Sequence, residues 1–253
     1  MITKEMIDNR IENFLGYGNL NSEIWFIGME EGFNGDEQDL GNRFSSTKDK
    51  SIIDLQGMPC VKDHLKWFQP DSPIQKTWRK LILILLVLRS ENNIDDKKIK
   101  QFQIEKLGRK ESNHCILELM PLPCGSTKPT DWKKIYTKFG DKLGIDYLKS
   151  RQYYLDKVRP NRIEKFKGLV KGLVDKHSPK TIICYGLTYL KEWEEIIGPG
   201  RKEKEIEIGK RKLYFYKNDK TNFFVIPHPC AWGLTNNDWL GIASEIKQNR
   251  DSF

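Results

Sequence analysis

Three short runs of apolar residues constrain the fold of this chain most strongly. They are Glu23-IWFI-Gly28, His114-CILELM-Pro121 and Lys180-TIICY-Gly186. Each run is apolar almost throughout instead of alternating with polar residues, which is typical of a strand buried on both faces. Strands of this kind lie in the middle of a parallel sheet that helices cover on both sides.

Helical patterns separate these runs, at residues 4–15, 75–90, 161–177, 187–196 and 238–248. Parallel strands need such crossover helices between them. We therefore predict an α/β fold, a three-layer α/β/α sandwich with a central, mostly parallel sheet. One domain is expected to span residues 1–253. Asn236-Asn237-Asp238 supplies a capping side chain for the last helix.

Two further segments give local predictions. Lys212-LYFYK and Thr221-NFFVI-Pro227 flank Asn218-Asp219-Lys220, a pattern that predicts a hairpin or a tight connection. The polar, lysine-rich stretch 95–113 predicts a solvated insertion rather than a domain boundary.

Composition and charge exclude several classes of protein. Hydrophobic residues make up 38% of 253 residues, enough for a sizeable core, so general disorder is excluded. The longest aliphatic run, Leu81 to Leu88, is far shorter than the roughly 20 residues of a membrane helix. The N-terminal MITKEMIDNR lacks the apolar stretch of a signal peptide. We expect a soluble, cytoplasmic protein without a membrane partner, and its net charge of +8 favours a polyanionic one.

The cysteines and the absent motifs narrow the chemistry. The five cysteines are widely spaced without a C-x-x-C pair, which predicts buried thiols in a reducing compartment and no disulfide framework or zinc ribbon. The sequence contains no phosphate-binding G-x-x-x-x-G-K-[ST], no G-x-G-x-x-G after the first strand and no H-E-x-x-H. We therefore expect no metal and no cofactor.

Acidic residues and a histidine follow three of the predicted strands. The first strand leads into Gly28-Met29-Glu30-Glu31-Gly32, the second carries Glu118, and the last ends in Pro227-His228-Pro229. Functional residues of an open α/β sheet lie beyond the carboxyl ends of its strands. A single Glu or His there is weak evidence, but the three together define a candidate site.

In these segments the chain resembles the uracil-DNA glycosylase superfamily. Members share a first-strand motif G-x-[D/N]-P-[Y/G], a central strand ending in a base-reading Asn, and a C-terminal H-P-S loop. Gly28 to Gly32, Ile116-Leu117-Glu118 and His228-Pro229-Cys230 match them in order, and the resemblance covers residues 14 to 248. It implies a monofunctional DNA glycosylase, active as a monomer on double-stranded DNA.

The resemblance also assigns roles to residues. Glu30 stands where the family's acid handles the attacking water, and His228 where a histidine stabilises the departing base. Gly28 lies at the start of the base-binding loop. Phe44 has the place of an aromatic that stacks on the extruded base. Trp232 and Leu234 follow the His-Pro step, where family members insert a wedge into the duplex.

Three departures from the uracil pattern bear on the substrate. Gly32 replaces a Tyr that bars groups on the base C5, so it leaves room there, and it also fits a turn that needs positive φ. Glu118 replaces the base-reading Asn, and a carboxylate pairs with the N4 amine of cytosine if one proton is shared with N3. A Glu facing solvent is the other interpretation of Glu118. Glu31 replaces Pro, either sharing the role of Glu30 or charging the start of the next helix.

The sequence therefore predicts a glycosylase for a C5-substituted cytosine, such as glucosylated hydroxymethylcytosine in phage DNA. Removing such a base would serve antiviral defence, because abasic phage DNA fails to replicate. Two alternatives remain. One is repair of uracil or other deaminated bases, and the other is a non-catalytic DNA-binding protein with this fold.

Overall fold

Four parallel strands form the centre of one eight-stranded sheet, whose order is β3-β1-β4-β2-β5-β8-β7-β6. The computed structural model describes residues 1–58, 60–126, 128–176, 180–198, 201–218 and 220–251. The central strands are β4 (His114–Cys124), β2 (Ile24–Gly32), β5 (Thr181–Tyr185) and β8 (Asn222–Ile226), each parallel to its neighbour. The predicted parallel centre of the sheet is confirmed.

Shorter or more polar strands extend the sheet on both sides. On one side β1 (Gly16–Gly18) pairs antiparallel with β4, and β3 (Ile52–Ile53) lies outside it. On the other side β7 (Arg211–Lys217) pairs antiparallel with β8, and β6 (Arg201–Ile208) with β7. The predicted pairing of 212–217 with 221–226 is thus confirmed, although Asp219 of the connection lies outside the described residues. The sequence did not predict β1, β3 or β6, which are very short or strongly charged.

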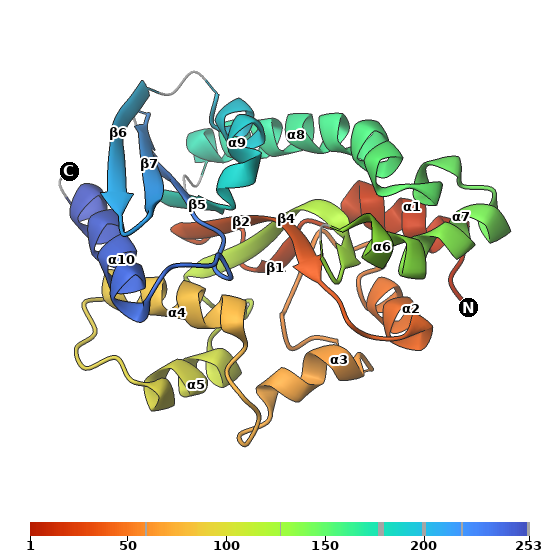
Figure 1. Cartoon of the computed structure of the whole chain (residues 1–253), viewed down its shortest axis with the longest axis horizontal. Coiled ribbons are helices and arrows are strands. Elements are labelled where there is room, and N and C mark those ends of the chain that lie inside the picture. Colours follow the sequence, from red (N-terminus) through yellow and green to blue (C-terminus); the bar gives the residue numbers. More distant parts are fainter. Residues whose placement is uncertain (59, 127, 177–179, 199–200, 219, 252–253) are drawn as a thin grey trace.

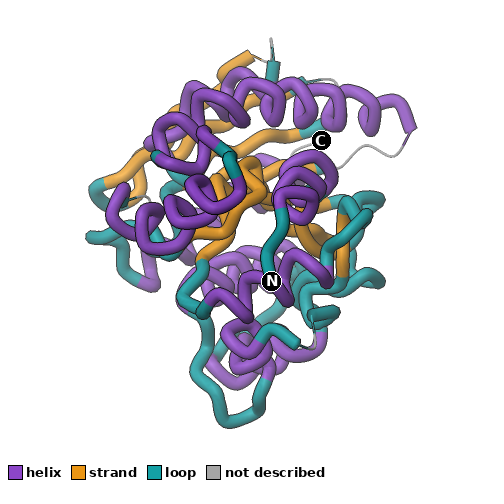
Figure 2. Tube along the Cα trace, turned by 90° about the vertical axis from the view of Figure 1, so that its right-hand side faces the viewer, coloured by secondary structure: helices purple, strands orange, loops and turns teal. Residues whose placement is uncertain are grey.

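Helices cover both faces of the sheet, so that the molecule has three layers (Figure 1). The helices on one face are α1 (Lys4–Asn13), α2 (Glu37–Ser46), α6 (Pro129–Trp132), α7 (Lys138–Leu143), α8 (Arg151–Lys176) and α9 (Leu190–Ile197). Those on the other are α3 (Lys62–Leu65), α4 (Lys76–Leu88), α5 (Asp96–Glu105) and α10 (Asn236–Asp251). Single turns at Lys66–Phe68, Lys133–Thr137, Asp146–Lys149 and Leu187–Tyr189 complete the connections. Figure 2 shows the strands enclosed between the helices.

The core consists of two clusters, one on each face of the sheet. Because side chains alternate along a strand, Trp25 and Ile27 of β2 belong to one cluster and Ile24 and Phe26 to the other. All four side chains are at most 5% exposed. This double burial is the reason why the strand is apolar at consecutive positions.

Two helices differ from the sequence prediction. Helix α8 begins ten residues earlier than expected, at Arg151, and holds Pro160 in its interior. The lysine-rich stretch 95–113 is not a solvated insertion, because it forms α5, whose Ile99 and Phe102 are buried in the core. Two apolar residues spaced three apart among lysines are enough to anchor one face of a short helix.

The cap of α10 uses the side chain of Asp238, as predicted, together with that of Thr235, which the prediction did not include. The Asp238 carboxylate accepts hydrogen bonds from the backbone N–H and the hydroxyl of Thr235, both at 2.7 Å, and the Asp238 N–H donates to the Thr235 hydroxyl at 3.2 Å. This reciprocal pair is a capping box, and it satisfies backbone N–H groups that the first turn leaves free. The helix is therefore capped from Thr235.

Candidate functional site

The carboxyl ends of β4, β2, β5 and β8 bring the predicted site residues to one edge of the sheet. In the parallel register Gly28 of β2 lies beside Glu118 of β4, and Tyr185 ends the next strand, β5. His228 follows two residues after the end of β8. Residues that are distant in the sequence therefore approach one another only because these four strands are neighbours in the sheet.

Glu118 is a buried carboxyl group, so the interpretation as a solvent-facing glutamate is wrong. The residue is 5% exposed, and its Oε2 has no hydrogen-bond partner within the described part of the chain. Burial raises the pKa of Glu118 well above its ordinary value, and the nearby Glu31 and Glu30 carboxylates add to this effect. A carboxyl group that keeps its proton offers one donor and one acceptor.

Tyr185 is the aromatic side chain next to Glu118. A Cβ atom at Gly28 would collide with the Tyr185 hydroxyl, so glycine at this position makes room for the ring. The ring centroids of Tyr185 and His228 are 5.8 Å apart, in an edge-on arrangement. Glu118 and Glu31 are among the charges that act on the Tyr185 phenol. Tyr185 thus lies between the acidic residues and the histidine.

The Cys230 backbone defines the tautomer of His228. The Cys230 N–H donates to Nδ1 of His228 at 3.1 Å, so a neutral ring carries its proton on Nε2. Desolvation lowers the pKa of His228 below its ordinary 6.5, although the residue as a whole is exposed. At neutral pH His228 is therefore an uncharged hydrogen-bond donor through Nε2.

Glu31 is the centre of a buried ionic network. Its Oε1 accepts from the Tyr17 hydroxyl and pairs with Arg43, and its Oε2 lies 3.1 Å from the Arg10 guanidinium. Burial favours the neutral form of Glu31, but Arg43 and Arg10 outweigh it and lower the pKa of the carboxyl below its usual value. Both oxygens are engaged, so Glu31 is a weak base with little capacity left for a water molecule.

Glu30 has a different environment. Its side chain is 7% exposed, and its Oε2 lies 2.9 Å from Nη1 of Arg151, the first residue of α8. Burial raises the pKa of Glu30 above its ordinary value, against the lowering effect of Arg151. Within the described chain neither of these two atoms has an aligned hydrogen bond. Of the two adjacent glutamates, Glu30 is therefore the one that retains basicity and unfilled hydrogen-bonding capacity.

Phe44 does not lie at this site. It is 2% exposed in the core cluster on the face of α2, whereas Tyr185 belongs to the cluster on the opposite face. Its ring faces Arg10, with the guanidinium carbon 5.9 Å from the ring centroid. Phe44 is therefore a core side chain here, the alternative to base stacking that an aromatic residue at this position allows.

The predicted wedge residues differ in exposure. Trp232 is 91% exposed, and Arg211 donates to its backbone oxygen at 3.2 Å. Leu234 is partly buried and packs against the core near α10. Trp232 is thus free to insert into a partner, while Leu234 anchors the loop.

Gly32 does not occupy a left-handed turn. Its φ lies outside the positive range, and no atom lies within 4 Å of the position that a Cβ would take. The interpretation as a turn glycine is wrong, whereas the expected open space beside Gly32 is present.

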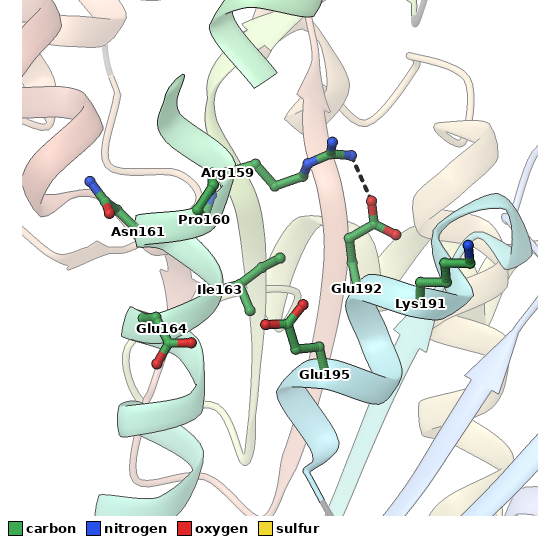
Figure 3. Close-up of a pocket in the computed structure, with 8 residues that line it drawn as sticks. All are labelled: Arg159, Pro160, Asn161, Ile163, Glu164, Lys191, Glu192 and Glu195. Carbon is green, nitrogen blue, oxygen red and sulfur yellow. Dashed lines mark hydrogen bonds and ion pairs between the residues drawn. The ribbon is translucent and has the colours of Figure 1, made fainter. Parts of the chain in front are cut away.

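Two surface pockets of the described chain have a volume of about 360 Å³ each. One is near the carboxyl edge of the sheet, and the other is in a helical layer. One adjoins Gly32, and its lining includes Phe33, Asn34, Asp36, Gly125 and Asp131. The other lies between α8 and α9, where Arg159 pairs with Glu192 at 2.6 Å (Figure 3). The lining of the pocket at Phe33, the residue after Gly32, combines carboxylates and an amide with Lys134, Lys138 and aromatic rings.

The sequence did not reveal four contributors to the site, namely Tyr185, Arg151, Arg10 and Arg43. For Tyr185 the sequence gave a weak indication, because this residue ends an apolar strand and directly precedes a glycine. The arginines gave no signal, because α1, α2 and α8 bring them to the site from separate parts of the chain.

Among the described residues, no three His, Cys, Asp or Glu side chains come together as a set of metal ligands. None of the described helices has the length and apolar character needed to cross a bilayer. No family model and no curated protein matches the chain.

Proposed function

We propose that the protein is a DNA glycosylase of the uracil-DNA glycosylase type, which flips out a C5-substituted cytosine and hydrolyses its N-glycosidic bond. Two observations support the proposal: the carboxyl groups of Glu30 and Glu118 interact across β2 and β4, and His228 follows the neighbouring strand β8 with its ring 5.8 Å from that of Tyr185. An acid, a base-reading group and an imidazole donor are the parts that this reaction requires.

The hydrolysis develops positive charge on the sugar and negative charge on the leaving base. Glu30 stabilises the cation and takes a proton from the attacking water, and its raised pKa strengthens it as a base. Neutral His228 donates from Nε2 to the base O2 as negative charge develops there. Glu31 holds β2 to its neighbouring helices instead of acting on water.

Glu118 reads the base. As a neutral acid it donates to N3 of cytosine and accepts from the N4 amine, so its raised pKa supplies the proton that this pairing needs. A neutral carboxyl can also reverse its donor and acceptor to match uracil. This keeps repair of uracil as the second candidate function, and it makes uracil the competing substrate in any assay.

The surroundings of Gly32 support a substituent on C5. No atom lies within 4 Å of the position that a Cβ of Gly32 would take, where the family has a tyrosine side chain, and a pocket of about 360 Å³ is lined by the next residue, Phe33. Exposed Trp232 supports binding to a duplex whose stack must be opened, and the net charge of +8 supports a DNA partner. Phage DNA, which carries bulky modified cytosines, is the substrate that we propose.

The decisive experiment is an alkali-cleavage assay on duplex oligonucleotides that carry uracil, mismatched thymine, 5-hydroxymethylcytosine or its glucosylated form. We expect cleavage of the modified cytosines, and its loss in Glu30→Gln with duplex binding retained. Glu23→Gln, which changes an exposed carboxylate just before β2, serves as the control for the loss of one acid. Cleavage confined to uracil would favour repair, and binding without any abasic site would favour a non-catalytic protein.

A further inference from the structure

Arg151 is the cation that contacts Glu30, and both side chains are buried. The guanidinium is 6% exposed and the carboxylate 7%, with 2.9 Å between Nη1 and Oε2. A buried carboxylate without a partner is costly, so this contact decides whether Glu30 exists there as an anion. Arg151 also begins α8, so its backbone is fixed by a helix of 26 residues.

The other groups around Glu30 do not replace this charge. They are Glu31 on the same strand, Glu118 and Cys124 on β4, Tyr154 on α8, Tyr136 in the turn 133–137, and Tyr189 before α9. These groups are acids, phenols or a thiol, which raise the cost of a negative charge on Glu30 or leave it unchanged. Of the groups facing Glu30 in the described chain, Arg151 is the cation.

Tyr189 is a second partner of Arg151. Its hydroxyl is a hydrogen-bond partner of the guanidinium. The turn before α9 permits this because Gly186 has a φ of +106°, and a Cβ there would lie 3.3 Å from the Tyr189 ring. The turn after β5 thus directs Tyr189 toward Arg151, which in turn contacts Glu30.

We propose that Arg151 is the positioning residue of the candidate site, orienting the Glu30 carboxylate and keeping it ionised for its work on the attacking water. This inference rests on the proposed glycosylase function for its kinetic consequence, but the ion pair itself is open to a direct test. Arg151 acts through Glu30 and makes no contact with substrate in this proposal.

The expected consequence is a displaced pH profile. Glu30 accepts a proton only while it is ionised, so activity falls as the pH drops through its pKa. An adjacent cation lowers a carboxyl pKa by about 1 to 3 pH units. Arg151→Met therefore moves the acidic limb of the rate profile upward by about that amount. The rate near neutral pH falls, and alkaline pH restores it.

The test compares Arg151→Met, Arg151→Gln and Arg151→Lys with Arg159→Met. Arg159 lies two turns further along α8 and pairs with Glu192, so it controls for the loss of an arginine from this helix. The first readout is the pH dependence of single-turnover excision. The second is a carbon-13 NMR titration of the glutamate carboxyl groups, with the Glu30 signal assigned by its loss in Glu30→Gln.

We expect both readouts to move upward in Arg151→Met, to stay near wild type in Arg151→Lys, and to be unchanged in Arg159→Met. Arg151→Gln also removes the charge but retains polar atoms in the same space. If Arg151→Met does not fold, the two readouts are taken from Arg151→Gln, and the same upward shift is expected. A uniform loss of rate at every pH, with an unchanged Glu30 titration, would overturn the proposal. If the wild type excises no base, the proposed function fails, while the titration still decides the role of Arg151.

Discussion

Replacing Glu118 by Gln tests whether this carboxyl group is buried with its proton. Gln has nearly the same shape and offers a donor and an acceptor, but it cannot ionise. Burial and the neighbouring Glu31 and Glu30 raise the pKa of Glu118 well above 4.5 in the folded protein. In the unfolded chain, Glu118 releases this proton near its ordinary pKa. At any pH above that value and below the folded-state pKa, the wild type therefore takes up a proton when it folds.

The sign and the size of the effect follow from this uptake. Below the ordinary pKa both states hold the proton, and the wild type and Glu118→Gln have similar stability. Above it, the free energy of unfolding of the wild type falls relative to the variant by about 1.4 kcal/mol per pH unit. The loss continues until the pH passes the folded-state pKa and then levels off. For a chain of this length each pH unit lowers the relative melting temperature by roughly 3 to 6 °C.

Urea unfolding of both proteins at pH 5, 6, 7 and 8 measures the difference directly. Glu23→Gln is a suitable control, because Lys180 and Asn113 bind that exposed carboxylate and lower its pKa, so its effect should stay constant over this range. A stability difference for Glu118→Gln that is independent of pH would show that Glu118 is already ionised. The proposed readout of cytosine by a neutral carboxyl would then be wrong.

Four other substitutions have definite expected outcomes. Gly28→Ala drives a methyl group into the Tyr185 hydroxyl and should cost about 1 to 3 kcal/mol, whereas Gly32→Ala, with open space around it, should leave the melting temperature nearly unchanged. Trp232→Ala should change stability by less than about 0.5 kcal/mol because the side chain is 91% exposed, yet weaken duplex binding in a fluorescence titration; equal affinity would remove Trp232 from the DNA interface. Glu31→Gln removes the anion from a buried cationic network and should cost about 3 to 5 kcal/mol in urea unfolding. Because the pKa of Glu31 is lowered, its contribution should be complete above the ordinary pKa and disappear in more acidic solution; a small loss at pH 7 would contradict the network.

The sequence was sufficient for the central strands and for most of the long helices. A strand buried on both faces needs apolar residues at consecutive positions, and Ile24 to Ile27 display this requirement directly. It also located His228 just beyond the last central strand, but it ended the first strand at Gly28 and the second at Pro121, whereas β2 continues to Gly32 and β4 to Cys124. Gly28 and Glu118 therefore lie within their strands. The predicted strands and helices depend on local periodicity, which is a property of neighbouring positions.

Tertiary structure alone decided the electrostatic character of the site. Glu30 and Glu31 are adjacent and chemically identical, yet burial raises the pKa of Glu30 while two arginines lower that of Glu31. The difference arises because Arg10 and Arg43 pair with Glu31, whereas among the described residues Arg151 is the cation that pairs with Glu30. Charge interactions in a protein interior depend on distance in space and on desolvation, and separation along the chain fixes neither of them.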